Sequence, residues 1–85
     1  MKVKLLFFAA LREQLGTTGE EIELPAGVTT LGGLREHLCA RGGGYAKAFA
    51  EKALVRMAVN HEMAKPGAAL AAGDEVAFFP PVTGG

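Results

Sequence analysis

The sequence predicts one small α+β domain, and three observations lead to that fold class. The chain has 85 residues, which leaves room for a single hydrophobic core. It is 49% hydrophobic and 21% charged, a balance that favours a packed fold over disorder. Its hydrophobic patterns follow the order strand, strand, helix, strand, short strand, strand. We therefore expect one main helix to cover one face of a sheet.

The N-terminal part predicts two paired strands. Residues 2–8 alternate polar and apolar side chains at first and are apolar on both faces at the end, which is typical of a strand entering the interior of a sheet. Residues 9–15 are rich in helix formers and stop at Gly16, so one or two helical turns are expected. Residues 20–24 alternate acidic and aliphatic side chains, which predicts a half-exposed strand paired with the first.

The middle of the chain predicts the main helix. Thr30 is a suitable N-cap. Three leucines follow on one stripe, namely Leu31, Leu34 and Leu38. The glycine pair 32–33 disfavours the first turn, so packing is expected to hold it, and glycines 42–44 are expected to end the helix. Residues 45–53 then predict a second short helix or an ordered loop, with Phe49 as its buried anchor.

The C-terminal part predicts three further strands. Residues 54–60 alternate apolar and polar side chains, and a turn at Asn60 and His61 leads to a short strand over residues 62–64. Residues 75–79 form the last strand, and two prolines end it. We therefore expect a domain over residues 1–79 and an extended tail over residues 80–85.

Charge and cysteine content exclude several classes of function. Nine Lys and Arg residues balance nine Asp and Glu residues, so no basic excess favours nucleic acid or an anionic membrane surface. No apolar stretch approaches the roughly 20 residues that cross a bilayer. Cys39 is the only cysteine and cannot form an internal disulfide, which favours a reducing compartment and therefore the cytoplasm.

The side chains form no conventional catalytic or cofactor site. His37 and His61 are isolated, and the sequence has neither paired-cysteine spacing nor a phosphate-binding glycine loop. We therefore expect no metal and no cofactor bound by this chain alone. Cys39 is interpreted as a small buried hydrophobic residue. Serine is absent, and no pair of acidic residues suggests a general acid and base. If the chain takes part in catalysis, its end is the remaining candidate for the reactive group.

The last strand and the tail suggest a partner protein. Phe78 and Phe79 are neighbours on one strand and point to opposite faces, so one of them needs a cover outside the core. Strand alternation alone leaves open which one faces outward. Pro80 and Pro81 favour an extended backbone, and six residues of about 3.3 Å each span about 20 Å. This length is sufficient to enter a pocket of another protein.

The chain ends in Gly84 and Gly85, which form a thread without side chains. Its terminal carboxylate can enter a narrow channel and, as an acyl adenylate, can accept a sulfur or amine nucleophile. In a chain as rich in glycine as this one, a Gly-Gly end arises by chance at around 2%. The pair alone is therefore suggestive and weak.

Motifs at both ends carry a specific resemblance. They are residues 6–13 (LFFAALRE), the pair Val59 and Asn60, and residues 73–85 (GDEVAFFPPVTGG). In these segments the chain closely resembles the MoaD-like sulfur carriers, the small subunits of molybdopterin synthase. The resemblance extends over the whole chain in length and element order, whereas residues 25–54 match no motif.

The resemblance implies a ubiquitin-like β-grasp fold, a mixed sheet of about five strands with one main helix packed on one face. It also implies that an E1-like adenylyltransferase uses ATP to adenylate Gly85, and that a desulfurase or rhodanese supplies the sulfur of a thiocarboxylate. This group then donates sulfur to cyclic pyranopterin monophosphate, forming the dithiolene of molybdopterin. The chain would act as the small subunit of a heterotetrameric sulfurtransferase, not catalytic alone.

The resemblance further implies the residues that meet the partners. Phe79 and Met63 are expected on the hydrophobic face that docks the large subunit and the activating enzyme, with Arg12 as a further candidate. The tail that inserts into the large subunit comprises Pro80, Pro81, Val82, Thr83 and Gly84. For Phe79 the alternative is ordinary core, and for Met63 and Arg12 a surface position without function.

Two other readings of the sequence remain. One is a sulfur carrier of the same fold that serves thiamine, tRNA or amino-acid biosynthesis; the Phe-Phe-Pro-Pro stretch favours molybdopterin. The other is a β-grasp binding module or protein modifier without sulfur chemistry. That reading predicts binding without Gly84 and Gly85, or Gly85 joined to lysines.

Overall fold

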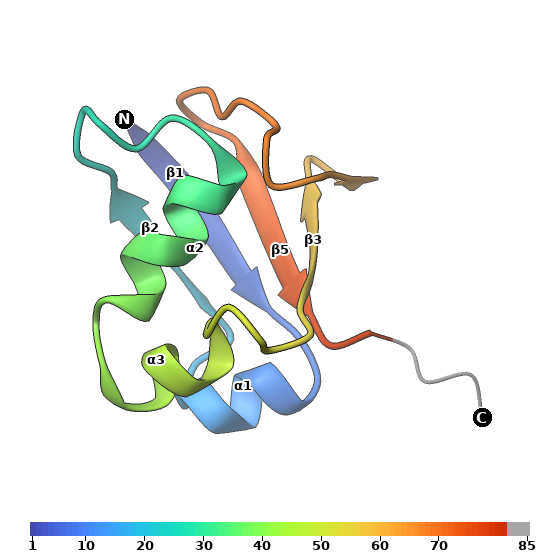
Figure 1. Cartoon of the computed structure of the whole chain (residues 1–85). Coiled ribbons are helices and arrows are strands. Elements are labelled where there is room, and N and C mark those ends of the chain that lie inside the picture. Colours follow the sequence, from blue (N-terminus) through green and yellow to red (C-terminus); the bar gives the residue numbers. More distant parts are fainter. Residues whose placement is uncertain (82–85) are drawn as a thin grey trace.

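The computed structural model describes residues 1–81 and contains one five-stranded sheet (Figure 1). The strands are β1 (Lys2–Phe7), β2 (Gly19–Glu23), β3 (Arg56–Val59), β4 (Glu62–Met63) and β5 (Glu75–Phe79). Their order in the sheet is β2-β1-β5-β3-β4. β1 and β5 are parallel, and the other neighbouring pairs are antiparallel. This mixed sheet, with helices on one face, confirms the predicted α+β, β-grasp fold.

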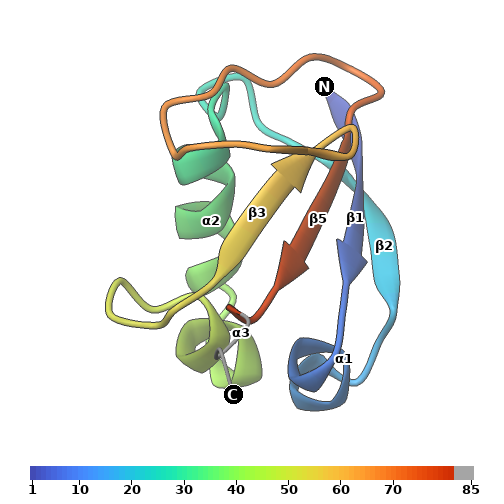
Figure 2. The same ribbon diagram turned by 90° about the vertical axis from the view of Figure 1, so that its right-hand side faces the viewer.

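Three helices complete the fold: the longest lies along one face of the sheet, and the two short ones lie at the end of the sheet where β1 and β5 finish (Figure 2). They are α1 (Ala10–Leu15), α2 (Leu31–Cys39) and α3 (Gly43–Ala48). α2 is the longest and crosses the sheet, as predicted for the main helix. None of the helices in residues 1–81 is long and apolar enough to cross a membrane.

The start of α2 confirms both the predicted cap and the role of packing. The Thr30 hydroxyl accepts a hydrogen bond from the Gly33 N–H at 3.1 Å. The Gly32 N–H donates to the Pro66 carbonyl at 2.8 Å. A Cβ atom at position 32 would lie 3.2 Å from that same oxygen. Glycine is thus present because the 66–68 loop approaches the helix closely.

The boundary between α2 and α3 differs from the prediction. α2 already ends at Cys39, and the glycines expected to terminate it instead begin α3. Gly42 has a φ of 80° and redirects the chain between the two helices. α3 ends at Ala48, so residues 45–53, predicted as a short helix or an ordered loop, contain the end of a short helix followed by a loop. The prediction that Phe49 anchors this segment is confirmed, because its side chain is buried.

The core fills the space between the helices and one face of the sheet, which we call the inner face. Three aromatic rings form its centre: Phe7 and Phe78 have centroids 5.9 Å apart, and Phe49 lies 5.0 Å from Phe78. The predicted leucine stripe of α2 is also completely buried. The paired strands β1 and β5 are therefore fixed by side chains that pack in the core. The end of β5 in turn fixes the point at which the C-terminal segment leaves the sheet.

Candidate functional site

The end of β5 determines where the C-terminal segment leaves the fold. Phe78 is completely buried, whereas Phe79 is half-buried and, as the next residue on the strand, points to the opposite face. The structure thus resolves what strand alternation left open: Phe78 belongs to the core and Phe79 to the outer face, the side of the sheet away from the helices. The alternative that Phe79 is ordinary core is not observed.

Beyond Phe79 the chain leaves the sheet. Pro80 and Pro81 are half-buried, belong to no strand, and carry the backbone away from the end of β5 (Figure 1). Neither proline has an N–H with which to continue the ladder. The predicted tail residues Val82, Thr83, Gly84 and Gly85 lie outside the described residues.

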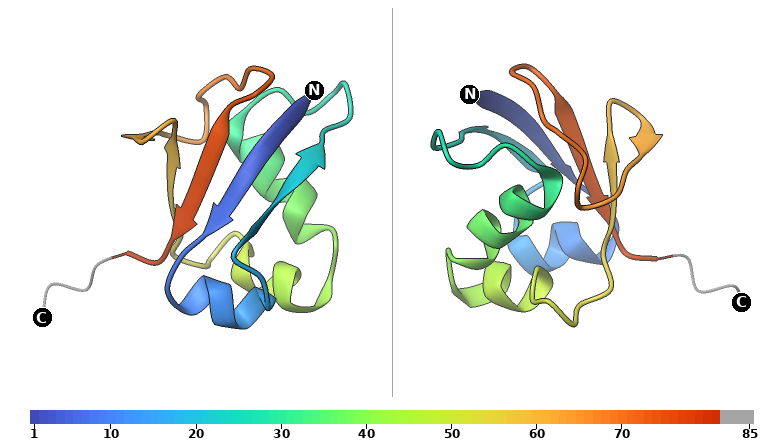
Figure 3. Two further views of the ribbon diagram at one scale, coloured as in Figure 1. Left: turned by 180° about the vertical axis from the view of Figure 1, so that it is seen from behind. Right: turned by 45° about the horizontal axis from the view of Figure 1, so that its top comes forward.

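The outer face of the sheet, seen from behind in Figure 3, carries an apolar row that the strand register defines. The strand register places Leu6 beside Ala77, Ala77 beside Ala58, and Ala58 beside Met63. None of these four side chains belongs to the core cluster. The row therefore crosses β1, β5, β3 and β4 on the face that the helices leave uncovered.

Two phenylalanines extend this row toward the tail. Phe7 and Phe78 are paired; Phe8 directly follows the end of β1, and Phe79 follows Phe78 on β5. Phe8 is 44% exposed and Met63 is 58% exposed, although both side chains are large and apolar. We call the following six residues the outer-face patch: Leu6, Phe8, Ala58, Met63, Ala77 and Phe79. Within the patch Phe8 and Met63 are exposed, Leu6, Ala77 and Phe79 are half-buried, and Ala58 is buried at 7% exposure. Exposed large apolar side chains that lie together in this way mark interaction surfaces.

The hairpin that carries Met63 is fastened to β5. Asn60 and His61 form its turn, as predicted, with φ values of 50° and 70°. The Asn60 amide donates to an Asp74 carboxylate oxygen at 3.0 Å, and its carbonyl oxygen accepts from the Glu75 N–H at 3.0 Å. These bonds join the turn to the start of β5 and hold Met63 in line with the patch.

The charged side chains of the outer face fall into two groups. On β1, Lys2 lies opposite Glu23, and Lys4 lies opposite Glu21 of β2 and Glu75 of β5. Near the tail exit the outer face carries a cation, because Arg56 is exposed beside Phe79. Arg12 is exposed as well, but it belongs to α1 and not to the outer face. The predicted candidates Phe79 and Met63 are thus brought onto one surface, and Arg12 lies on α1, near the same end of the sheet (Figure 3).

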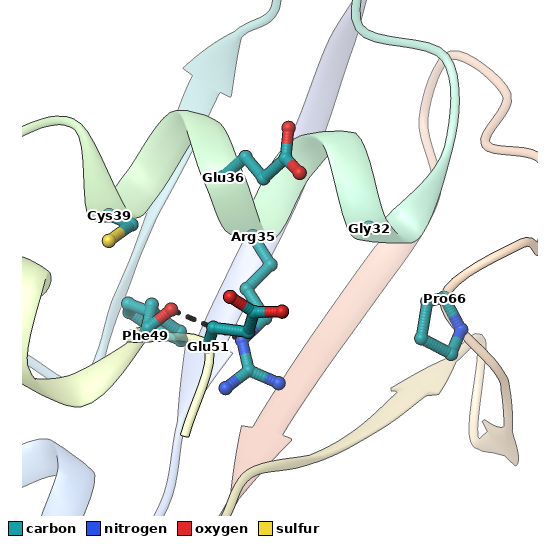
Figure 4. A pocket seen from close by; sticks show the side chains of 7 residues that line it. All are labelled: Gly32, Arg35, Glu36, Cys39, Phe49, Glu51 and Pro66. Atoms are coloured by element: carbon teal, nitrogen blue, oxygen red, sulfur yellow. Dashed lines mark hydrogen bonds between the residues drawn. The ribbon is translucent and has the colours of Figure 1, made fainter. Parts of the chain in front are cut away.

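A groove of about 560 Å³ lies on the helix side, between α2 and the segment that follows α3 (Figure 4). Arg35 lies in it and donates to three backbone carbonyls, those of Phe49 at 3.2 Å and of Ala50 and Ala53 at 2.6 Å each. Since these carbonyls occupy the guanidinium, the groove offers no free cation to a ligand. We interpret Arg35 as a clamp that replaces helical bonds over residues 49–53.

The remaining ionisable groups have structural positions. Within residues 1–81 no three His, Cys, Asp or Glu side chains come together in a way that could hold a metal ion. Cys39 is half-buried and faces the Ala46 carbonyl, 3.8 Å from its Sγ. Glu20 accepts two hydrogen bonds from Arg41, at 2.6 and 3.0 Å, and this contact lowers the pKa of the Glu20 carboxyl below its ordinary value of 4.5.

Sequence reasoning missed part of the outer-face patch. Leu6, Phe8, Ala58 and Ala77 were not predicted as interface residues. A signal was present in β1, because Leu6 and Phe8 break the alternation that a half-exposed strand shows. For the two alanines the sequence holds no comparable signal, since only the register brings them between Leu6 and Met63.

The chain matches a known protein family and is similar to named proteins of other organisms. The model of the ThiS family matches residues 5–85. The chain is 43% identical to the molybdopterin synthase sulfur carrier subunit of Escherichia coli over 83 residues, covering 98% of this chain and 99% of the relative. The subunit of the same name from Haemophilus influenzae is 41% identical, with the same coverage of both chains.

Solved structures agree on the fold. A Pyrococcus furiosus protein aligns with a TM-score of 0.79 at 36% identity, covering 96% of this chain and 99% of that one. SAMP1 of Haloferax volcanii, a small archaeal modifier protein, aligns with a TM-score of 0.76 at 30% identity, and both chains are covered completely. One chain of the Helicobacter pylori complex of subunits 1 and 2 of molybdopterin-converting factor shares the fold, with a TM-score of 0.69 at 23% identity and complete coverage of both chains.

Proposed function

The chain belongs to the ThiS family, and on this premise we propose that it is the sulfur carrier subunit of a molybdopterin synthase in the cytoplasm. One observation carries the proposal: curated relatives with this name are 40–43% identical to the chain over nearly its whole length. The reactive group in this proposal is the terminal carboxylate of Gly85.

The position of the outer-face patch supports a carrier that works inside a partner. The patch adjoins the end of β5, so a protein that covers Phe79 and Phe8 also meets the segment that leaves at Pro80. Residues 80–85 span about 20 Å when extended. When a partner docks on the patch, Gly85 can therefore reach a pocket inside that partner.

The proposed chemistry has two stages. First, the Gly85 carboxylate attacks the α-phosphate of ATP on an E1-like adenylyltransferase, pyrophosphate leaves, and an acyl adenylate forms. A cysteine persulfide on a desulfurase or rhodanese then attacks the acyl carbon and expels AMP, which gives an acyl disulfide. A second thiol cleaves its S–S bond, forms a disulfide with that cysteine, and releases the thiocarboxylate. In the second stage this sulfur attacks cyclic pyranopterin monophosphate, and water releases the carrier as a carboxylate.

The large subunit supplies the rest of the catalytic machinery in this proposal. A thiocarboxylate is a better nucleophile at neutral pH than a carboxylate. Within residues 1–81 the structure offers no cluster of acid and base groups beside the tail exit, so proton transfer falls to residues of the large subunit. Two carriers and two large subunits form the heterotetramer, and each dithiolene needs two sulfur transfers.

The test is the intact mass of the chain after incubation with its E1-like enzyme, ATP and a sulfur source. We expect the replacement of one oxygen by sulfur, located at Gly85 by fragmentation. Gly85→Ala is the matched variant: it should load poorly while its thermal unfolding is unchanged, because a methyl group hinders a thin channel and the last core residue among residues 1–81 is Phe78. An unchanged carboxylate in the wild type, under conditions that load the E. coli subunit, contradicts the proposal.

A second candidate is a protein modifier, favoured by the likeness to SAMP1 of Haloferax volcanii. In that role the Gly85 adenylate is attacked by a lysine amine and an isopeptide forms. Peptide mapping of cell extracts separates the two candidates. Lysines that carry a Gly-Gly remnant from this chain support the role of a protein modifier. Transfer of sulfur to the pyranopterin substrate by the purified synthase supports the role of a sulfur carrier.

A further inference from the structure

We infer that Arg56 determines which partners dock on the outer-face patch, by pairing with a carboxylate that the partner presents beside Phe79. The inference rests on the proposed function, because it describes how the same surface recognises the large subunit. Its basis is the position of one arginine and the absence of any compensation for its charge in residues 1–81.

The register of β3 places Arg56 on the outer face. Arg56 lies opposite Phe79 of β5, and the next residue, Met57, is buried in the core. Because neighbouring residues on a strand point to opposite sides, the exposed Arg56 side chain shares its face with the patch. β4 pairs only with Ala58 and Val59, so it leaves the flank of Arg56 uncovered.

The four arginines of the chain differ in their partners. Arg41 is held by Glu20, and Arg35 by three carbonyls. Within residues 1–81, Arg56 makes no side-chain hydrogen bond or ion pair, and the residue opposite it is a phenylalanine. The lysines of β1, in contrast, each face a glutamate across the sheet. Arg56 is therefore a cation set into an apolar surface without a local counter-charge.

The unpaired charge of Arg56 affects the binding free energy when a partner docks on the patch. A partner that covers Phe79 also covers the side chain next to it, and a guanidinium that loses water without gaining an acceptor weakens the complex. A carboxylate is the acceptor that matches its planar, two-pronged geometry. The partner surface is thus an apolar area that carries an Asp or Glu side chain.

The experiment measures the dissociation constant between the full-length carrier and the large subunit of the same organism. Arg56→Met removes the charge and keeps an apolar side chain of similar length, and Arg56→Glu reverses the charge. We expect about 10-fold weaker binding for the first variant and about 100-fold for the second. Lys47→Met and Lys47→Glu are the matched controls, since Lys47 is exposed on α3 on the helix side, and both should bind like the wild type.

Salt dependence and charge exchange test the carboxylate directly. Wild-type binding should weaken as ionic strength rises, and Arg56→Met should lose most of this dependence. An arginine in place of the partner's carboxylate should restore the binding of Arg56→Glu. If both Arg56 variants bind like the wild type, the inference about Arg56 is overturned. The proposed function still stands in that case, provided that the wild-type chain is loaded with sulfur at Gly85 and binds the large subunit. A wild-type chain that neither loads at Gly85 nor docks overturns both.

Discussion

The two faces of the sheet are built by alternate residues of the same strands and have opposite roles. On the inner face, Leu5, Val76 and Phe78 are completely buried beneath the helices. On the outer face, Leu6, Ala77 and Phe79 are their direct neighbours in sequence, and all three are only half-buried. The same strands thus supply two sets of apolar side chains, one that stabilises the fold and one that presents a surface to a partner.

The largest effect on stability is expected from a substitution on the inner face. Phe78→Ala removes a ring that contacts both Phe7 and Phe49, so we expect the free energy of unfolding to fall by about 3–5 kcal/mol. Chemical denaturation monitored by circular dichroism measures this change. A loss below about 1 kcal/mol would mean that the aromatic centre of the core is not what holds the sheet and helices together.

The matching change on the outer face is Phe79→Ala. Because Phe79 is half-buried and outside the core cluster, unfolding should become easier by less than about 1 kcal/mol. Binding to the large subunit should weaken by at least about 10-fold, because a central aromatic side chain is lost from the docking surface. Calorimetric titration and the same denaturation assay provide the two readings. Equal effects of Phe78→Ala and Phe79→Ala on stability would contradict the division into two faces.

A smaller effect is expected on the helix side, at Arg35. Arg35→Met removes three hydrogen bonds to the carbonyls of residues 49–53, and we expect a loss of about 1–2 kcal/mol. Amide hydrogen exchange should speed up in this segment first. Arg12→Met is the control, because Arg12 is exposed, and it should leave both stability and exchange unchanged.

The smallest expected effect concerns the ion pair at the edge of the sheet. Because Arg41 lowers the pKa of Glu20, the carboxylate stabilises the fold above pH 4.5, and this contribution disappears as the pH falls through the lower folded pKa. Glu20→Gln should therefore cost about 0.5 kcal/mol at neutral pH and nothing near pH 2. Thermal melts of both proteins across this pH range provide the measurement, and a difference that grows toward acid would contradict the assignment.

Much of the fold followed from local patterns in the sequence. The period of residues 2–8, the Thr30 cap with its leucine stripe and the Asn60–His61 turn all predicted elements that the structure contains. The end of α3 could not be predicted, because Arg35 reaches the 49–53 carbonyls from a helix that lies 14 to 18 residues earlier in the chain. Contacts between residues so far apart in the chain produce no periodic pattern in the sequence.

The candidate site divides in the same way. The sequence by itself determined the fold class and the family resemblance, and it is the source of the proposal that Gly85 is the reactive end, because these depend on side-chain chemistry and on order along the chain. Only the tertiary structure decided that Phe78 faces inward and Phe79 outward, and that Ala58 and Ala77 join Leu6 to Met63. It also placed Arg56 beside Phe79. The physical reason is that strand register, which brings distant residues side by side, is set by packing against the core.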